Sequence, residues 1–214
     1  MDALTQQTAA VALTARLATA VLPWRGAPPA TATHIPRLLD PSWLRALPLP
    51  IGDHRTNAQT VAFTDREGEF QREDTSAGIA RAYQERPRTL VYESADVRSD
   101  GWYSLTALHL ARTLRRRVVC SLYESNAQDR TLGPHDDAWD GLILQLRGAK
   151  LWTIWPDRNS DPTELLTEPG DLLLLPCGVV HDVSTPRQSV HAVFAITSHP
   201  LASARAPQKA ADVQ

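Results

Sequence analysis

The stretch Leu132–Trp152, which reads LGPHDDAWDGLILQLRGAKLW, determines the expected fold. It joins a His-x-Asp motif, His135 and Asp137, to an apolar run, Leu142–Leu146, and a turn signal at Gly148. An apolar run of this length bounded by turn signals suits a strand, and residues two apart on a strand face the same side. We therefore expect His135 and Asp137 to lie on a strand, with both side chains directed into a barrel.

Short apolar or alternating runs recur from Arg117 onward, and tight-turn signals separate them. The runs are Val118–Tyr123, Asp140–Leu146, Leu151–Trp155, Asp171–Leu175 and His191–Ile196, and the turn signals are Gly148, Pro156-Asp157, Pro169-Gly170 and Pro186. Several strands joined by turns, with no helices between them, predict an antiparallel sandwich or barrel.

The first part of the chain has helical periodicity instead. Helices are predicted over residues 4–21, 41–47, 77–85 and 104–114, with one strand at Thr89–Tyr92. Residues 26–36 are predicted as a loop, and residues 48–76 as containing at most short strands. The expected fold is mainly β with N-terminal helices: a helical or irregular region over residues 1–87, a barrel over 88–198 and a flexible tail over 199–214.

Composition excludes several classes of protein. The hydrophobic fraction of 43% supports a core, but no run of eighteen apolar residues predicts a transmembrane helix. A net charge of −2 gives no general attraction to nucleic acid or membrane. Two cysteines, Cys120 and Cys177, cannot form a disulfide scaffold and favour a reducing, cytoplasmic location. The Ala- and Arg-rich usage is typical of a bacterial protein.

A second histidine completes a possible metal site. His181 stands in the segment Pro176–His181, after a turn signal at Pro169-Gly170 and an apolar run. Two imidazoles and one carboxylate can hold Fe(II) on one face and leave its other positions open to substrate and oxygen. If His135, Asp137 and His181 converge, the protein is an oxygen-activating enzyme rather than a binding module.

The same segments resemble the cupin-type JmjC oxygenases. The resemblance is carried by Leu132–Trp152, by Glu168–His181 and by Ser189–Phe194, and it is similar to the ribosomal-protein hydroxylases within that group. It implies a double-stranded β-helix (a cupin or jelly-roll barrel) that uses Fe(II), 2-oxoglutarate as cosubstrate and O₂ to hydroxylate its substrate.

The resemblance also assigns roles to particular residues. His135, Asp137 and His181 match the iron ligands, and Lys150 matches a basic residue that binds the distal carboxylate of 2-oxoglutarate. Lys150 is the only lysine before Lys209 in a chain with 22 basic residues, so a specific role is favoured over a solvated surface position. Tyr123 is predicted to add a hydroxyl group to the same carboxylate, with core packing as the alternative.

Three further residues have two interpretations each. Gln145 either points into the barrel or is a satisfied buried amide. Asp140 either orients a ligand histidine or begins a strand. His191 is not assigned as a fourth ligand, because the triad is already complete.

The substrate is predicted only as a class. The chain ends soon after the barrel, which favours a small molecule, a free amino acid or an accessible peptide over a ribosomal protein. The preferred reaction is hydroxylation of an amino-acid side chain, free or within a peptide or protein. Two alternatives stay open: demethylation of a methylated residue, and a non-catalytic cupin-like barrel that binds a ligand or partner.

Overall fold

The computed structural model describes residues 3–26, 28, 30–49, 61–64, 71–98, 101–129, 131–157 and 160–197. The predicted tail, 199–214, lies outside the described residues. None of the described helices is long and apolar enough to cross a membrane.

The helices lie where the periodicity predicts them. They are α1 (Ala3–Val21), α2 (Pro41–Ala46), α3 (Ser76–Glu85), α4 (Ala95–Arg98) and α5 (Trp102–Leu114), with a short 3₁₀ turn, η1 (Leu22–Arg25), after α1. Side chains cap two of them: Asp40 accepts a hydrogen bond from Ser42 N at the start of α2, and Thr75 accepts one from Gly78 N at the start of α3. Of the five, only α4 was not predicted.

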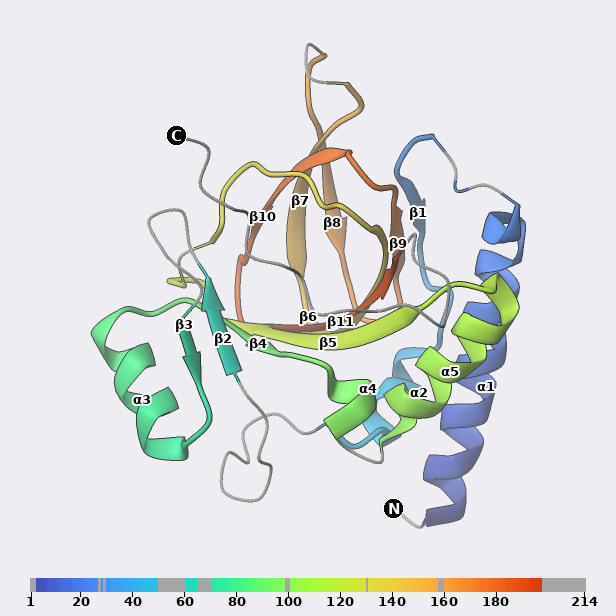
Figure 1. Ribbon diagram of the computed structural model, residues 1–214, viewed down its shortest axis with the longest axis horizontal. Helices are drawn as coiled ribbons and strands as arrows, with labels where there is room; N and C mark the ends of the chain where they lie inside the picture. The colour runs from blue at the N-terminus through green and yellow to red at the C-terminus, as the bar shows by residue number, and fades with distance from the viewer. Residues whose placement is uncertain are drawn as a thin grey trace.

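Two antiparallel sheets form the rest of the described molecule. The larger has eight strands in the order β1-β9-β6-β11-β5-β4-β2-β3. Its strands are β1 (Thr33–Ile35), β2 (Val61–Thr64), β3 (Gln71–Glu73), β4 (Thr89–Tyr92), β5 (Val118–Ser125), β6 (Asp140–Gly148), β9 (Leu172–Leu175) and β11 (Ser189–Ile196). The smaller has the order β10-β7-β8, from β7 (Lys150–Trp155), β8 (Thr163–Thr167) and β10 (Val180–Ser184). Figure 1 shows the two sheets around one interior, a double-stranded β-helix, with α1, α2 and α5 outside the larger sheet.

Strand alternation divides the core in two. On β6, Leu142 and Leu144 pack with the helices, whereas Ile143 between them faces the smaller sheet. On β11, Phe194 likewise belongs to the helical side and Val193 to the barrel interior. On β6 and β11, side chains of one face pack against the helices. The side chains that alternate with them point to the other face and line the barrel interior.

The structure corrects two predictions about local structure. His135 and Asp137 do not lie on a regular strand; they stand in the segment before β6, where His135 makes a single isolated bridge. Residues 26–36, predicted as a loop, contain β1, which pairs with β9 at the edge of the larger sheet. The region before residue 88 thus contributes three strands to that sheet, β1, β2 and β3, as well as helices.

Tight turns set the positions of the strands that surround the site. Gly148 ends β6 with φ +63°, and a Cβ atom there would lie 1.7 Å from the carbonyl oxygen of Gln188. A residue with a side chain fits neither the dihedral angle nor the space. Glycine is therefore required where the chain turns from the larger sheet into β7 and Lys150.

Candidate metal and anion site

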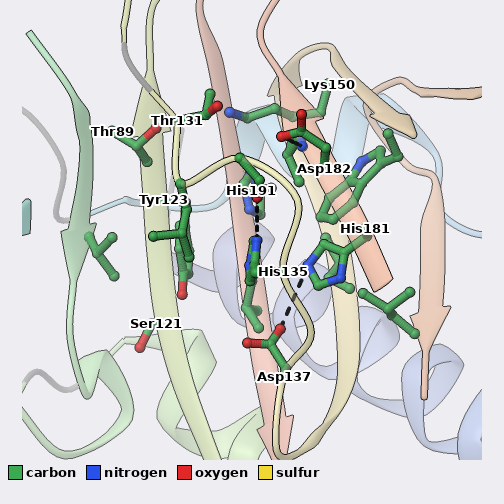
Figure 2. A pocket seen from close by; sticks show the side chains of 18 of the residues that line it. Thr89, Ser121, Tyr123, Thr131, His135, Asp137, Lys150, His181, Asp182 and His191 are labelled. Atoms are coloured by element: carbon green, nitrogen blue, oxygen red, sulfur yellow. Dashed lines mark hydrogen bonds and ion pairs between the residues drawn. The ribbon is translucent and has the colours of Figure 1, made fainter. Parts of the chain in front are cut away.

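Three predicted residues converge at one end of the barrel interior. One donor atom each from His135, Asp137 and His181 lies within 4.8 Å of the other two. Figure 2 shows the three side chains pointing toward one another, with Asp137 and His181 joined by the contact between Oδ2 and Nε2 at 3.8 Å. Two imidazoles and one carboxylate at this spacing form a donor set that suits a divalent transition metal such as Fe(II).

A backbone pair brings the two histidines together. His135 N–H donates to the carbonyl oxygen of His181 at 2.9 Å, and His181 N–H donates to that of His135 at 2.8 Å. The ring centroids are 4.3 Å apart. The segment before β6 therefore acts as one more partner of β10, and this pairing compensates for the absence of a regular strand at the His-x-Asp motif.

Both imidazoles are oriented in the same way. Nδ1 of His135 lies 2.7 Å from the carbonyl oxygen of Gly133, and Nδ1 of His181 lies 3.0 Å from that of Val179. A carbonyl oxygen can only accept, so each Nδ1 carries the proton. Nε2 of each ring is therefore unprotonated, and its lone pair can bind a metal.

Burial shifts the pKa values of Asp137 and His181. It raises the pKa of Asp137 to about 6, because the buried carboxylate has lost solvation, although His135 acts in the opposite direction. Burial lowers the pKa of His181 to about 4, so this imidazole is neutral near pH 7. A bound cation would offset the cost of the buried carboxylate, and a neutral His181 needs to release no proton to bind it.

Lys150 is a buried cation at the other end of the cavity. Its side chain is only 2% exposed, and Nζ donates hydrogen bonds to Ser125 Oγ at 2.7 Å and Thr185 Oγ1 at 2.6 Å. Within the described residues no carboxylate forms an ion pair with it. Burial lowers the pKa of Lys150 to about 8, with Asp129 acting in the opposite direction. A buried ammonium group held only by neutral hydroxyls is a suitable site for an anion.

The cavity between Lys150 and the triad is built in layers along the strands. On β7, Lys150, Trp152 and Ile154 alternate inward, and Ile154 stands opposite His181 in the register of β7 with β10. The middle layer is aromatic: Trp152 faces His191 of β11 with ring centroids 6.0 Å apart. The volume of this partly open cavity is about 280 Å³. It is large enough for a small molecule that contacts both the ammonium group and the three donor residues.

Tyr123 lines the same cavity from β5. Its ring stacks on His191 with centroids 4.9 Å apart and an angle of 14° between the planes. Burial raises the pKa of its hydroxyl group. In Figure 2 that hydroxyl lies at the end of the ring away from the Lys150 ammonium group and on the side of Asp137. The structure shows no contact between this hydroxyl group and Lys150.

Gln145 and Asp140 do not point into the site or orient a ligand histidine; their side chains form structural hydrogen bonds instead. Gln145 is a satisfied buried amide, with Nε2 donating to Ser189 Oγ and Oε1 accepting from Thr167 Oγ1. Asp140 touches neither histidine; it pairs with Arg116 at 2.6 Å and accepts a hydrogen bond from Cys177 N at 3.0 Å. Asp140 thereby fixes the turn that leads into β10 and His181.

No sequence pattern identifies Ser125 and Thr185, whose hydroxyl groups hold Lys150. Single Ser and Thr residues occur throughout the chain and carry no pattern of their own. The structure identifies both residues. Thr185 is brought level with Lys150 by the pairing of β7 with β10, and Ser125 lies on the inward face of β5.

The sequence of the barrel matches known proteins. Residues 99–203 match the family described as the JmjC domain. Ribosomal oxygenase 2 of Rattus norvegicus is 33% identical over 91 residues, which cover 36% of this chain and 20% of the rat protein. The Bos taurus protein of the same name is 32% identical over 96 residues, covering 38% of this chain and 21% of that protein. The chain thus matches about a fifth of the length of these relatives.

Solved structures share the architecture. The Escherichia coli ribosomal oxygenase YcfD superposes with a TM-score of 0.54 at 18% identity, covering 83% of this chain and 49% of that chain. An oxidoreductase of the 2OG-Fe(II) oxygenase family from Burkholderia pseudomallei gives 0.52 at 16% identity, covering 87% and 92%. At these identities the likeness establishes the shared fold.

Proposed function

The chain carries a JmjC domain of cupin architecture, and from this premise we propose that it is an Fe(II)- and 2-oxoglutarate-dependent oxygenase that hydroxylates an amino-acid side chain. One observation carries the proposal: a three-residue donor set and an unneutralised buried ammonium group occupy opposite ends of one cavity. A metal site alone would suit many proteins. A metal site with a cationic anchor across the cavity suits a metal-chelating dicarboxylate.

His135, Asp137 and His181 would hold the iron. Their lone pairs face one another, and the carbonyl oxygens of Gly133 and Val179 keep both imidazoles in the binding tautomer. Fe(II) with 2-oxoglutarate and O₂ supplies an oxidation that converts the cosubstrate to succinate and CO₂ and inserts one oxygen atom into a substrate C–H bond. The protein contributes three ligands and leaves the side facing the cavity for small molecules.

Lys150 would bind the distal carboxylate of 2-oxoglutarate. The two hydroxyl groups that accept its hydrogen bonds hold the ammonium group in place without cancelling its charge. The apolar and aromatic wall, including Ile143, Trp152 and Val193, excludes water and so strengthens the ion pair that the cosubstrate would form. Tyr123 is not included in this contact, because its hydroxyl group lies at the end of its ring away from Lys150, and its ring instead packs on His191.

The substrate that we propose is an amino-acid side chain, free or within a peptide or protein. The names of the relatives refer to the ribosome, which supports a protein substrate, although the matched segment is only a fifth of their length. Removal of a methyl group would begin with the same hydroxylation and end with loss of formaldehyde, so mass spectrometry distinguishes the two reactions. A product heavier by one oxygen supports hydroxylation, and a product lighter by CH₂, in which hydrogen has replaced a methyl group, supports demethylation.

Succinate formation tests the proposal directly. Purified protein supplied with Fe(II), ascorbate and ¹³C-labelled 2-oxoglutarate should release labelled succinate even without substrate, at a slow uncoupled rate visible by NMR. His135→Ala should abolish it. A wild-type protein that binds 2-oxoglutarate and produces no succinate with any candidate peptide would instead be a non-catalytic ligand-binding barrel.

A further inference from the structure

His191 is a buried polar residue of the cavity wall with no role in the site described so far. It is 3% exposed and projects from β11, the central strand of the larger sheet. Three fully enclosed side-chain atoms in the described part of the chain lack a hydrogen-bond partner, and only one of them, Nδ1 of His191, belongs to a residue that lines the cavity. Buried polar atoms are nearly always paired, so this exception needs an explanation.

The position of His191 is fixed between the two ends of the cavity. It stands opposite Tyr123 in the pairing of β11 with β5, and its ring is clamped between Tyr123, at 4.9 Å, and Trp152, at 6.0 Å. Figure 2 shows it between the Lys150 ammonium group and the three side chains of the triad. His191 therefore lines the same cavity as both Lys150 and the triad.

His191 is not a fourth metal ligand. The donor set that converges within 4.8 Å consists of His135, Asp137 and His181, and His191 is not part of it. Nor does packing require an imidazole there, because a phenyl ring would fill the same space between two aromatic neighbours with no unpaired nitrogen.

The ring is suited to donate a hydrogen bond. Burial and the neighbouring Lys150 lower the pKa of His191 well below its ordinary value, so the imidazole is neutral and has one N–H and one lone pair. A proton on the enclosed Nδ1 would bury a donor without an acceptor. The proton therefore belongs on Nε2, and no described residue accepts a hydrogen bond from it.

We propose that His191 is a further cosubstrate-binding residue, whose Nε2–H donates a hydrogen bond to the dicarboxylate that would lie between Lys150 and the triad. This inference rests on the proposed function. Lys150 then supplies the charge, and His191 supplies a directional contact at the middle of the cavity, held in orientation by the stacked Tyr123 ring. The Nε2–H group is thus paired when the cosubstrate is bound, whereas the enclosed Nδ1 carries no proton in either state, so no buried donor is left without an acceptor.

Equilibrium binding tests this role without turnover. Mn(II)-loaded protein without oxygen is titrated with 2-oxoglutarate by calorimetry, for wild type, His191→Phe and, as a matched control, His109→Phe on the exposed face of α5. His191→Phe should weaken 2-oxoglutarate binding about tenfold or more, since the lost hydrogen bond has a charged acceptor. Its Mn(II) affinity should stay within twofold of wild type, its melting temperature should be unchanged or higher, and His109→Phe should match wild type.

Each result has a distinct meaning. A His191→Phe protein that binds 2-oxoglutarate within twofold of wild type would overturn the role of His191 and leave the proposed function standing. A wild-type protein that binds no 2-oxoglutarate would remove the proposed function and this inference together. If His191→Phe does not fold, His191→Leu takes its place with the same expected loss of affinity. Failure of both variants to fold would assign His191 to packing and overturn the proposal.

Discussion

Lys150 and His181 enter the same cavity from two adjacent strands of the smaller sheet, at opposite ends of its length. The register places His181 opposite Ile154, and Thr185, just past the end of β10, reaches Lys150 with its hydroxyl group. One pair of strands thus sets the separation between the ammonium group and the triad. This separation determines the length of molecule that can contact both.

Removal of one donor should abolish metal binding. We expect His135→Ala to lower the affinity for Fe(II) or Mn(II) at least about 100-fold, because two ligands do not form a facial site. Anaerobic metal titration measures this, with His109→Ala as the control, since His109 is exposed on α5. Unchanged metal affinity in His135→Ala would disprove the ligand assignment.

Replacing Lys150 should affect the cosubstrate and leave the metal bound. Lys150→Ala removes the only cation found at that end of the cavity among the described residues, so the concentration of 2-oxoglutarate needed for half-saturation should rise at least about 100-fold. Mn(II) affinity should stay within twofold. A half-saturation concentration equal to wild type would remove Lys150 from the cosubstrate site.

The low pKa of Lys150 predicts that 2-oxoglutarate binding weakens at alkaline pH. The free protein loses the Lys150 proton above a pKa of about 8, so the dissociation constant should rise as pH increases through that value, by about tenfold near pH 9. A lysine with an ordinary pKa near 10.5 would show no such change. Lys150→Arg, which keeps its charge, should bind equally well at pH 7 and pH 9. An identical pH dependence in both proteins would contradict this cause.

The contact between Asp140 and Arg116 should contribute to stability as well as to the position of His181. Asp140→Ala removes the carboxylate that pairs with Arg116 Nη1 and accepts from the backbone N–H of Cys177, while Arg116 keeps its hydrogen bonds to the carbonyl oxygens of Thr197 and Ile196. We expect the free energy of unfolding to fall by about 2 to 4 kcal/mol. The exposed pair Arg72–Glu93 is the control, since Arg72→Ala there should cost about 1 kcal/mol or less. Denaturant titration of the metal-free protein compares the two, and equal losses would contradict the assignment.

Gly148 offers a test of the turn that precedes Lys150. Gly148→Ala requires a left-handed dihedral angle and brings Cβ against the Gln188 carbonyl group, so we expect a loss of at least about 2 kcal/mol. Gly26→Ala is matched in chemistry but has open space and φ −90°, and it should be close to neutral. Similar stability of the two variants would show that this turn can relax.

Much of the site was predictable because its residues have rare identities and regular spacing. His135, Asp137, Lys150 and His181 stand out in the sequence, and the structure brings all four to one cavity. Apolar alternation predicted strands β5, β6, β7, β9 and β11, and each predicted end lies within two residues of the observed one. These signals depend on residue type and on the spacing of residues along the chain, and both can be read from the sequence.

The missing parts depend on pairing across the sheet. Strand β1 has three residues within a Pro- and Thr-rich segment, and only its partner β9 makes it a strand. The His-x-Asp motif was expected on a strand, but its backbone is fixed by the bridge to His181, which no local pattern encodes. The lack of a hydrogen-bond partner for His191 Nδ1 can be recognised only from the three-dimensional positions of its neighbours.

The three strands contributed by the region before residue 88 have a practical consequence for anyone who shortens the protein to its catalytic barrel. A chain beginning at residue 88 would lose β1 beside β9 and β2 beside β4, and both flanks of the larger sheet would then expose unsatisfied backbone amides and carbonyls. Exposed edge strands of this kind can pair with strands of other molecules and cause aggregation. Aggregation of the trimmed protein would therefore reflect a stripped sheet, and would say nothing about its chemistry.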